Sequence, residues 1–160
     1  MAMASPGGRI VVGVDGSVGA RDALRWALRQ AGLTGAVVHV VHAVRHIDAF
    51  DWAALPTNYG TVPTPVRYDR DEVHTTAERL TRDTVSAVVA EDAGFGSVPV
   101  TIDVVDGHPG DALLAGASDA ELLVLGRTGH GGFAGMGLGS IARHCVEHST
   151  CGVTIVPPPA

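Results

Sequence analysis

A glycine-rich segment near the C-terminus carries the residues whose types and spacing are best suited to binding chemistry. It follows the apolar run Glu121–Leu125 and leads into Ile141–Ser149, an apolar-periodic stretch that predicts a helix. A strand, a glycine loop and a helix start form the arrangement in which backbone N–H groups close on a phosphate. The positions that define it are Gly126, Gly129, Gly139 and Ser140. The segment therefore predicts an anion site where glycines let a ligand approach the backbone.

Several side chains add polarity to this expected site. Arg127 and His130 lie inside the loop and could neutralise phosphate charge. Gly139 and Ser140 stand at the helix start, where unpaired N–H groups and the helix dipole favour an anion by about 0.3–1 kcal/mol each. The Ser140 hydroxyl is a further donor. A merely flexible connection is the alternative interpretation of the loop, because the chain contains 21 glycines.

A second polar group follows the first apolar run of the chain. Asp15 stands at the tip of that expected strand, where its carboxylate could accept a hydrogen bond from a ribose hydroxyl or hold Mg²⁺. Asp15 and Ser17 could also cap the helix that follows. The capping role and the binding role are compatible for Asp15.

The elements that must position these residues alternate along the chain. Apolar runs predict strands over Arg9–Val14, Ala36–Val44, Val98–Val105, Glu121–Leu125 and Gly152–Val156. Helical spacing predicts helices over Ala20–Ala31 (ended by Gly32), Tyr68–Ala93, a short segment beginning at His108-Pro109 and Ile141–Ser149. The inward stripe of the long helix is expected to be Val73, Ala77, Leu80, Thr84 and Val88. Residues 45–68 predict a long loop with a short helical turn near Phe50–Ala54.

This alternation predicts an α/β fold, a doubly wound five-stranded parallel sheet with helices on both faces. We expect the strand order 3-2-1-4-5, in which a ligand crevice lies between strands one and four, beyond their carboxyl ends. The tips of those two strands carry Asp15-Gly16-Ser17 and the glycine loop. The two strand ends richest in glycine and polar residues would therefore flank the crevice.

Length and composition fit one domain. Of the 160 residues 46% are hydrophobic and only 4% aromatic, which is typical of parallel sheets covered by helices. Residues 1–8 predict a flexible N-terminal tail and residues 9–157 the domain. No apolar run reaches the roughly 18 residues of a membrane span, and no secretory signal is present. We therefore expect a cytoplasmic protein without a membrane partner.

The charged residues exclude several function classes. The net charge of −6 argues against general affinity for nucleic acid. All 11 basic residues are arginines, and the absence of lysine excludes a P-loop and Schiff-base chemistry. Cys145 and Cys151 predict free thiols in a reducing compartment.

The glycine segment resembles the nucleotide signature of the universal stress protein family. That signature is Gly, two residues, Gly, nine residues, Gly, then Ser or Thr, and Gly126–Ser140 matches it without a gap. The opening Val12–Ser17 and the closing Cys151–Val156 are similar to the first and last strands of the family. Val41–Val44 and Asp106–Pro109 resemble its second strand end and the turn before its third helix. The resemblance extends from about residue 9 to residue 157.

The resemblance implies an ATP-binding stress-response regulator with an adenine nucleotide alpha hydrolase-like fold, usually a homodimer that acts on a further protein partner. It places Asp15 near the ribose or triphosphate, and Ala43 at the adenine beside Val14. Gly126 and Gly129 would line the ribose and phosphates, and the phosphate tail would be held by Gly139, Ser140 and Ile141. At most weak ATP hydrolysis is expected.

Two other function classes stay open. One is an ATP-dependent enzyme, a slow ATPase or a nucleotidyl transferase, although no general base is evident. The other is a dimeric scaffold with an empty cleft, against which the intact glycine pattern argues. A dinucleotide oxidoreductase is disfavoured because the glycines after the first strand have the wrong spacing and no carboxylate ends the second strand.

The histidines and the last strand complete the sequence-based expectations. His144 and His148 share a helix face, but no third metal ligand stands at useful spacing, so we expect surface histidines. His39 and His42 should point to opposite faces of their strand. The last strand is apolar and lies at a sheet edge, so we expect homodimer pairing through Val153–Val156.

Overall fold

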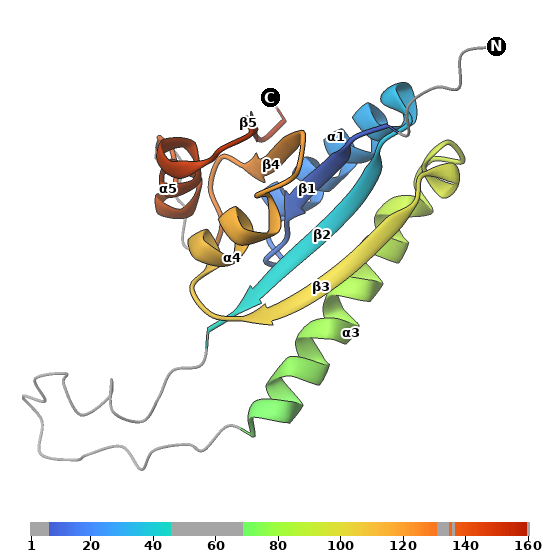
Figure 1. Ribbon diagram of the computed structural model, residues 1–160. Helices are drawn as coiled ribbons and strands as arrows, with labels where there is room; N and C mark the ends of the chain where they lie inside the picture. Colours follow the sequence, from blue (N-terminus) through green and yellow to red (C-terminus); the bar gives the residue numbers. More distant parts are fainter. Residues whose placement is uncertain (1–6, 46–68, 131–134, 136, 160) are drawn as a thin grey trace, which may run out of the picture.

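The computed structural model describes residues 7–45, 69–130, 135 and 137–159, which contain a five-stranded parallel sheet (Figure 1). Its order is β3-β2-β1-β4-β5, which confirms the predicted topology. The strands are β1 (Arg9–Gly13), β2 (Val37–Val44), β3 (Val100–Asp106), β4 (Leu122–Gly126) and β5 (Gly152–Val156). All four neighbouring pairs are parallel, so the carboxyl ends of all five strands lie at the same end of the sheet.

Helices cover both faces of this sheet (Figure 1). They are α1 (Val18–Thr34), α3 (Arg70–Val89), α4 (Pro109–Gly116) and α5 (Ser140–His148). Helices α1 and α3 pack on one face, and α4 and α5 on the other. A short 3-10 helix, Phe95–Ser97, precedes β3. The fold is therefore the doubly wound α/β sheet that the alternation of elements predicts.

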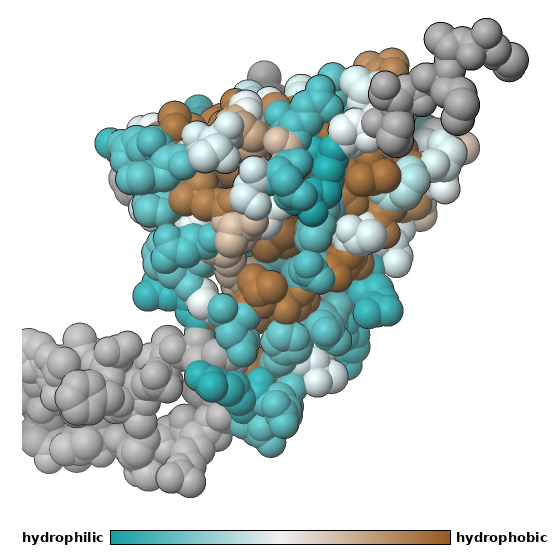
Figure 2. All heavy atoms as spheres, viewed as in Figure 1, coloured by the Kyte–Doolittle hydropathy of each residue, from teal (hydrophilic) through white to brown (hydrophobic). Residues whose placement is uncertain are grey.

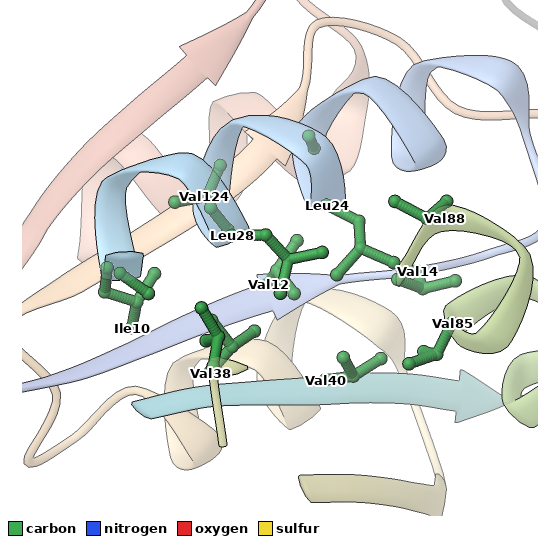
Figure 3. Close-up of a cluster of buried hydrophobic side chains, with 14 of the residues drawn as sticks. Ile10, Val12, Val14, Leu24, Leu28, Val38, Val40, Val85, Val88 and Val124 are labelled. Carbon is green, nitrogen blue, oxygen red and sulfur yellow. The ribbon is translucent and has the colours of Figure 1, made fainter. Parts of the chain in front are cut away.

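The larger core fills the face under α1 and α3. Val12 of β1 is fully buried there, and Leu24 and Leu28 of α1 lie over the strand (Figure 3). Val11, the next residue along β1, points to the other face and joins the core under α4 and α5. Each fully buried leucine or valine contributes roughly 1.5–3 kcal/mol, so both layers hold the strand ends in fixed positions.

The end of α1 differs from the prediction. Gly32 lies inside the helix, which continues to Thr34. Gly35 is the C-cap, with φ 73°, and its N–H donates to the Ala31 carbonyl. The prediction was wrong because Gly35 has the left-handed conformation that ends helices, whereas Gly32 is a glycine tolerated near a helix end.

The inward face of α3 is also corrected. Leu80 is 54% exposed, whereas Thr81 is 2% exposed and belongs to the buried face. Thr81 Oγ1 donates to the Ala77 carbonyl and accepts from His42 Nδ1 at 2.6 Å, so its polar group is satisfied in the core. Ala77, Thr84 and Val88 are buried as predicted, while Val73 is only partly buried.

Element bounds differ from the predictions mostly by one or two residues. The strand Gly152–Val156 has the predicted bounds, and α5 begins at Ser140 rather than at Ile141. The helix predicted over Tyr68–Ala93 is described as Arg70–Val89, with Asp69 as its N-cap. Strand β3 begins two residues late, because Val98 caps the 3-10 helix.

Some expectations concern residues that the structure does not describe. They are most of the tail 1–8, nearly all of the predicted loop 45–68 with its helical turn, and residues 131–134 and 136 of the glycine loop.

None of the helices in the described residues is long and apolar enough to span a membrane. On the face that Figure 1 presents, hydrophobic residues form separate patches between hydrophilic ones (Figure 2).

Candidate functional site

A cavity of about 890 Å³ opens where the carboxyl ends of β1 and β4 meet. All eleven residues that the sequence predicts to bind a ligand line this cavity. They are Val14, Asp15, Ser17, Ala43, Gly126, Arg127, Gly129, His130, Gly139, Ser140 and Ile141. These residues come from four distant segments of the chain, and the strand order brings them to one place.

The turn after β1 holds one wall of the cavity. Val14 is buried, and its N–H donates to the Val41 carbonyl at 3.0 Å, which ties the turn to β2. Gly16 has φ 82°, a conformation that glycine adopts without strain. Ser17 is the N-cap of α1 and accepts from the Ala20 N–H at 3.2 Å, so its predicted capping role is confirmed.

Asp15 joins this turn to the glycine loop. Its Oδ1 accepts from the N–H and the hydroxyl of Ser17, at 2.9 and 2.5 Å. Its Oδ2 accepts from the His130 N–H at 3.3 Å, and the His130 ring Nε2 lies 2.6 Å from the Asp15 carbonyl oxygen. A Cβ on Gly129 would lie 2.5 Å from Asp15 Oδ2, so a larger residue there would force the carboxylate or the loop to shift.

These contacts lower the pKa of Asp15 below its ordinary value. Partial burial acts in the opposite direction and is the largest single influence, since it disfavours the charged form. The hydrogen bonds from the Ser17 hydroxyl, the Ser17 N–H and the His130 N–H together outweigh it, helped by the nearby imidazole of His130. Asp15 is therefore a carboxylate at neutral pH.

Gly126 has a packing role in addition to its place in the cavity wall. A Cβ at this position would lie 2.8 Å from the backbone carbon of Gly19 and 2.9 Å from its oxygen. Helix α1 therefore approaches β4 through two facing glycines. The absent side chain of Gly126 makes room for α1, whereas the sequence pattern predicts that it makes room for the ligand.

The start of α5 forms the far side of the cavity. Gly139 is its N-cap and offers no side-chain acceptor, so the first-turn N–H groups have no side-chain partner in the cap. Its own N–H donates to the Arg127 carbonyl at 2.8 Å, which closes the base of the loop. Ser140, Ile141 and Ala142 line the cavity ahead of the first helical bond, from the Arg143 N–H to the Gly139 carbonyl. This is the geometry in which a helix start binds an anion.

Several lining residues were not predicted. Arg45 after β2 and Arg143 in α5 add two guanidinium groups. Val41, Leu113 and Leu125 supply an apolar wall, and Pro109 belongs to the start of α4. The alternation along β2 could have indicated Val41, because it shares a face with Ala43 and pairs in register with Gly13. No local signal places Leu113 or Arg143 at the cavity.

No metal centre is present in the described part of the chain, where no group of three or more His, Cys, Asp or Glu side chains could hold an ion. The rings of His144 and His148 lie 4.6 Å apart, and His144 Nε2 lies 3.3 Å from Asp111 Oδ1. His39 pairs with Asp103, whereas His42 contacts Thr81 of α3. His39 and His42 therefore point to opposite faces of β2, as predicted.

Three comparisons relate this geometry to known proteins. The model of the universal stress protein family matches residues 8–157. Universal stress protein Rv2624c of Mycobacterium tuberculosis is 32% identical over 147 residues, which cover 92% of this chain and 47% of that protein. The chain thus spans about half the length of the first curated relatives it matches. Universal stress protein Sll1388 of Synechocystis is 29% identical, with 93% of this chain and 97% of that protein covered.

The fold is likewise similar to solved structures of this kind. A universal stress protein in complex with cAMP superposes with a TM-score of 0.61 at 25% sequence identity. The match covers 97% of this chain and 100% of that chain.

Proposed function

Because the chain belongs to the universal stress protein family, we propose that it binds an adenine nucleotide, ATP foremost, in the cavity between β1 and β4. We propose further that it acts as a stress-response regulator rather than as an efficient enzyme. One observation carries the proposal: the complete glycine signature, Gly126–Ser140, ends at an uncapped helix start on the rim of a cavity.

The cavity has the two kinds of surface that a nucleotide requires. Val41, Leu113 and Leu125 supply an apolar wall for a base, with the backbone of Val14 and Ala43 beside it. The start of α5 and the glycine loop supply backbone donors for phosphates. The relative whose structure contains cAMP is 25% identical to this chain, which supports an adenine nucleotide as the ligand class.

Mg²⁺ would enter with the nucleotide. Asp15 is charged at neutral pH, but its oxygens already accept three hydrogen bonds. In the described part of the chain, no group of three or more His, Cys, Asp or Glu side chains could hold a metal ion by itself. Phosphate oxygens would therefore be the main ligands of the ion, with Asp15 as the protein group that could support them.

A regulatory role fits the lining better than a catalytic one. Among the lining residues that the structure describes, Asp15 and His130 are the groups that could act as a general base. Both are engaged with each other, and the pKa of Asp15 is lowered, which weakens it as a base. Nucleotide occupancy would instead alter the contact between the glycine loop and the β1–α1 turn, and through it a surface offered to a protein partner.

We also propose a homodimer through β5. This strand pairs with β4 on one side only and carries no charged residue from Gly152 to Val156. Edge strands without charges are prone to pair with another chain.

The first test identifies the ligand directly. The purified protein is denatured, and the released small molecules are separated and weighed by mass spectrometry. Bound adenine nucleotide in stoichiometric amount is the expected result. If nucleotide is neither carried through purification nor bound by the empty protein in calorimetry with Mg-ATP, the proposal is wrong.

The second test concerns the helix start. Ser140→Leu places a branched apolar group at the exposed first position of α5. We expect ATP to bind about tenfold more weakly, because one charge-assisted hydrogen bond is lost and the approach to the N–H groups is narrowed. Ser86→Leu, an exposed serine on α3 outside the cavity, is the control and should bind like the wild type.

A further inference from the structure

Three arginines from separate elements line the candidate nucleotide cavity. Arg45 follows β2, Arg127 follows β4, and Arg143 lies in the first turn of α5. Asp15 is the only carboxylate among the described residues that line it. The cavity is therefore cationic, although the whole chain has a net charge of −6.

This charge is local rather than a property of the surface in general. A second hollow of about 660 Å³, beside α4, has the opposite sign. It is lined by Arg9 and by four aspartates, Asp103, Asp106, Asp111 and Asp119. Outside the cavity, Arg9 pairs with Asp119, and Arg25 pairs with Glu91 and Asp22. In the part of the chain that the structure describes, no such pair forms for Arg45, Arg127 or Arg143.

Arg127 is the most constrained of the three. Its N–H donates to the Val156 carbonyl at 3.0 Å, and its carbonyl accepts from the Gly139 N–H at 2.8 Å. The backbone under the side chain is thus fixed on both sides. Its Nε is buried and has no hydrogen-bond partner. A buried guanidinium donor without an acceptor costs free energy, which a bound anion would recover.

Asp15 does not neutralise the arginines. Its two carboxylate oxygens accept hydrogen bonds from Ser17 and His130, and within the described residues Asp15 forms no ion pair with an arginine. Arg45 and Arg143 are exposed, which leaves both free to reorient toward a ligand. Guanidinium groups bind phosphate oxygens in a bidentate manner.

We propose that Arg45, Arg127 and Arg143 form an arginine clamp that selects a ligand by its number of phosphates, favouring a polyphosphate tail over a monophosphate or cyclic monophosphate. This inference rests on the proposed function and specifies it. A triphosphate tail carries about four negative charges at neutral pH and a cyclic monophosphate one. Only the longer tail offers enough charge and reach to engage three guanidinium groups from three elements.

The test measures selectivity rather than binding alone. Calorimetry compares ATP, AMP and cAMP on the full chain and on Arg45→Gln, Arg127→Gln and Arg143→Gln. We expect ATP affinity to fall about threefold for each exposed arginine and about tenfold or more for Arg127. In the same variants the affinity for AMP and for cAMP should change less than about twofold. Added salt should weaken the binding of ATP more than that of AMP or cAMP.

Arg82→Gln is the matched control. It removes the same charge from an exposed arginine on α3, which lines neither hollow. Its ATP affinity should equal that of the wild type, and thermal unfolding should show that all four variants are folded. The clamp is wrong if Arg82→Gln weakens ATP as much as the cavity variants do, or if ATP and AMP lose affinity equally.

Inorganic tripolyphosphate separates the clamp from the nucleotide proposal. If it binds and the cavity variants weaken it while adenosine and AMP do not bind, the clamp stands and the nucleotide proposal falls. If ATP and AMP bind with similar affinity and the arginine substitutions change neither affinity, the clamp is wrong and nucleotide binding stands. Binding of neither tripolyphosphate nor ATP overturns both.

Discussion

At the residue scale, Asp15 couples the two strand ends that form the cavity. Its carboxylate accepts hydrogen bonds from Ser17, next to β1, and from His130, beyond β4. Gly129 favours the second contact, because a Cβ there would force Asp15 Oδ2 or the loop to shift. The residues of the glycine signature therefore help to hold the cavity in shape as well as offering room to a ligand. Variants of these glycines would report folding and binding together.

We predict that Asp15→Asn lowers stability at neutral pH and that the difference disappears in acid. The folded-state pKa of Asp15 is depressed, so the unfolded chain binds the proton more readily. The stabilisation is therefore fully present above about pH 4, the ordinary range of an aspartate, and is lost as the pH falls through the folded-state value. Its size should stay below about 1 kcal/mol, because Asp15 is only partly buried and solvent screens the exposed part of the group.

Urea unfolding of both proteins from neutral pH to about pH 2.5 measures this effect. Asp83→Asn, which removes a carboxylate at an exposed position on α3 away from the cavity, is the matched control. A constant offset for Asp15→Asn over the whole range would mean that the carboxylate charge does not stabilise the loop contact.

Other single residues show the limit of reading a helix by its apolar spacing. Leu80 fits the expected stripe of α3 and yet is exposed, whereas the neighbouring Thr81 is buried. Thr81 tolerates burial because both hydrogen-bonding roles of its hydroxyl are satisfied. The hydroxyl accepts a hydrogen bond from His42 of β2 and donates one to the Ala77 carbonyl. The partner on β2 is 39 residues away, so no local pattern could have indicated it.

At the element scale, the two glycines at the end of α1 should respond in opposite directions to the same substitution. Gly32→Ala should stabilise the protein by about 0.5–1 kcal/mol, because alanine is the better residue in a helix and Gly32 is exposed. Gly35→Ala should destabilise it by about 1 kcal/mol, because alanine is strained at a φ of 73°.

Thermal and chemical unfolding of the two variants measure these changes. The space at both sites is open, with nothing within 4 Å of a Cβ at Gly35 and Val98 Cγ2 at 3.9 Å from one at Gly32. Steric clash is therefore not a competing cause. Equal destabilisation by both substitutions would contradict the assignment of Gly35 as the helix end.

The order and type of the regular elements followed from the sequence because the apolar runs are short, β-branched and separated by clear helical periods. The strand order was an assumption, which the placement of the polar ends at Asp15 and Gly126 beside one crevice supported. Boundaries were less predictable, since they depend on contacts such as the bond from the Val14 N–H to the Val41 carbonyl. Strand β1 ends at Gly13, although this bond still ties Val14 to β2.

The candidate site was predictable where it is continuous in sequence. The glycine signature and the β1–α1 turn are local motifs, and the sheet brings both to the cavity. Arg45, Arg143 and the apolar wall from α4 were not predictable, because their place depends on how α4 and α5 pack across the strands. Long-range packing thus supplies the part of the lining that would distinguish one ligand from another.

At the scale of the whole molecule, the two edges of the sheet differ in charge. Strand β3 carries Asp103 and Asp106, and charges of this kind keep an edge from pairing with other chains. Strand β5 reads GVTIV, and none of its residues is fully buried in the single chain. Val153 and Ile155 pack against the core under α4 and α5, whereas Thr154 belongs to neither core. This asymmetry leaves β5 as the edge suited to a second copy.

We predict that Thr154→Arg disrupts the proposed dimer without unfolding the chain. A guanidinium at the centre of β5 would face its own copy across a two-fold axis, and two like charges directly opposite each other oppose pairing. Thr101→Arg, on the opposite edge strand β3, is the matched control and should remain dimeric. Light scattering at tens of micromolar protein measures the mass of each variant, and circular dichroism checks the fold. A wild-type chain that is monomeric would contradict the proposed dimer. A Thr154→Arg variant that stays dimeric would show that the two copies meet through a surface other than β5.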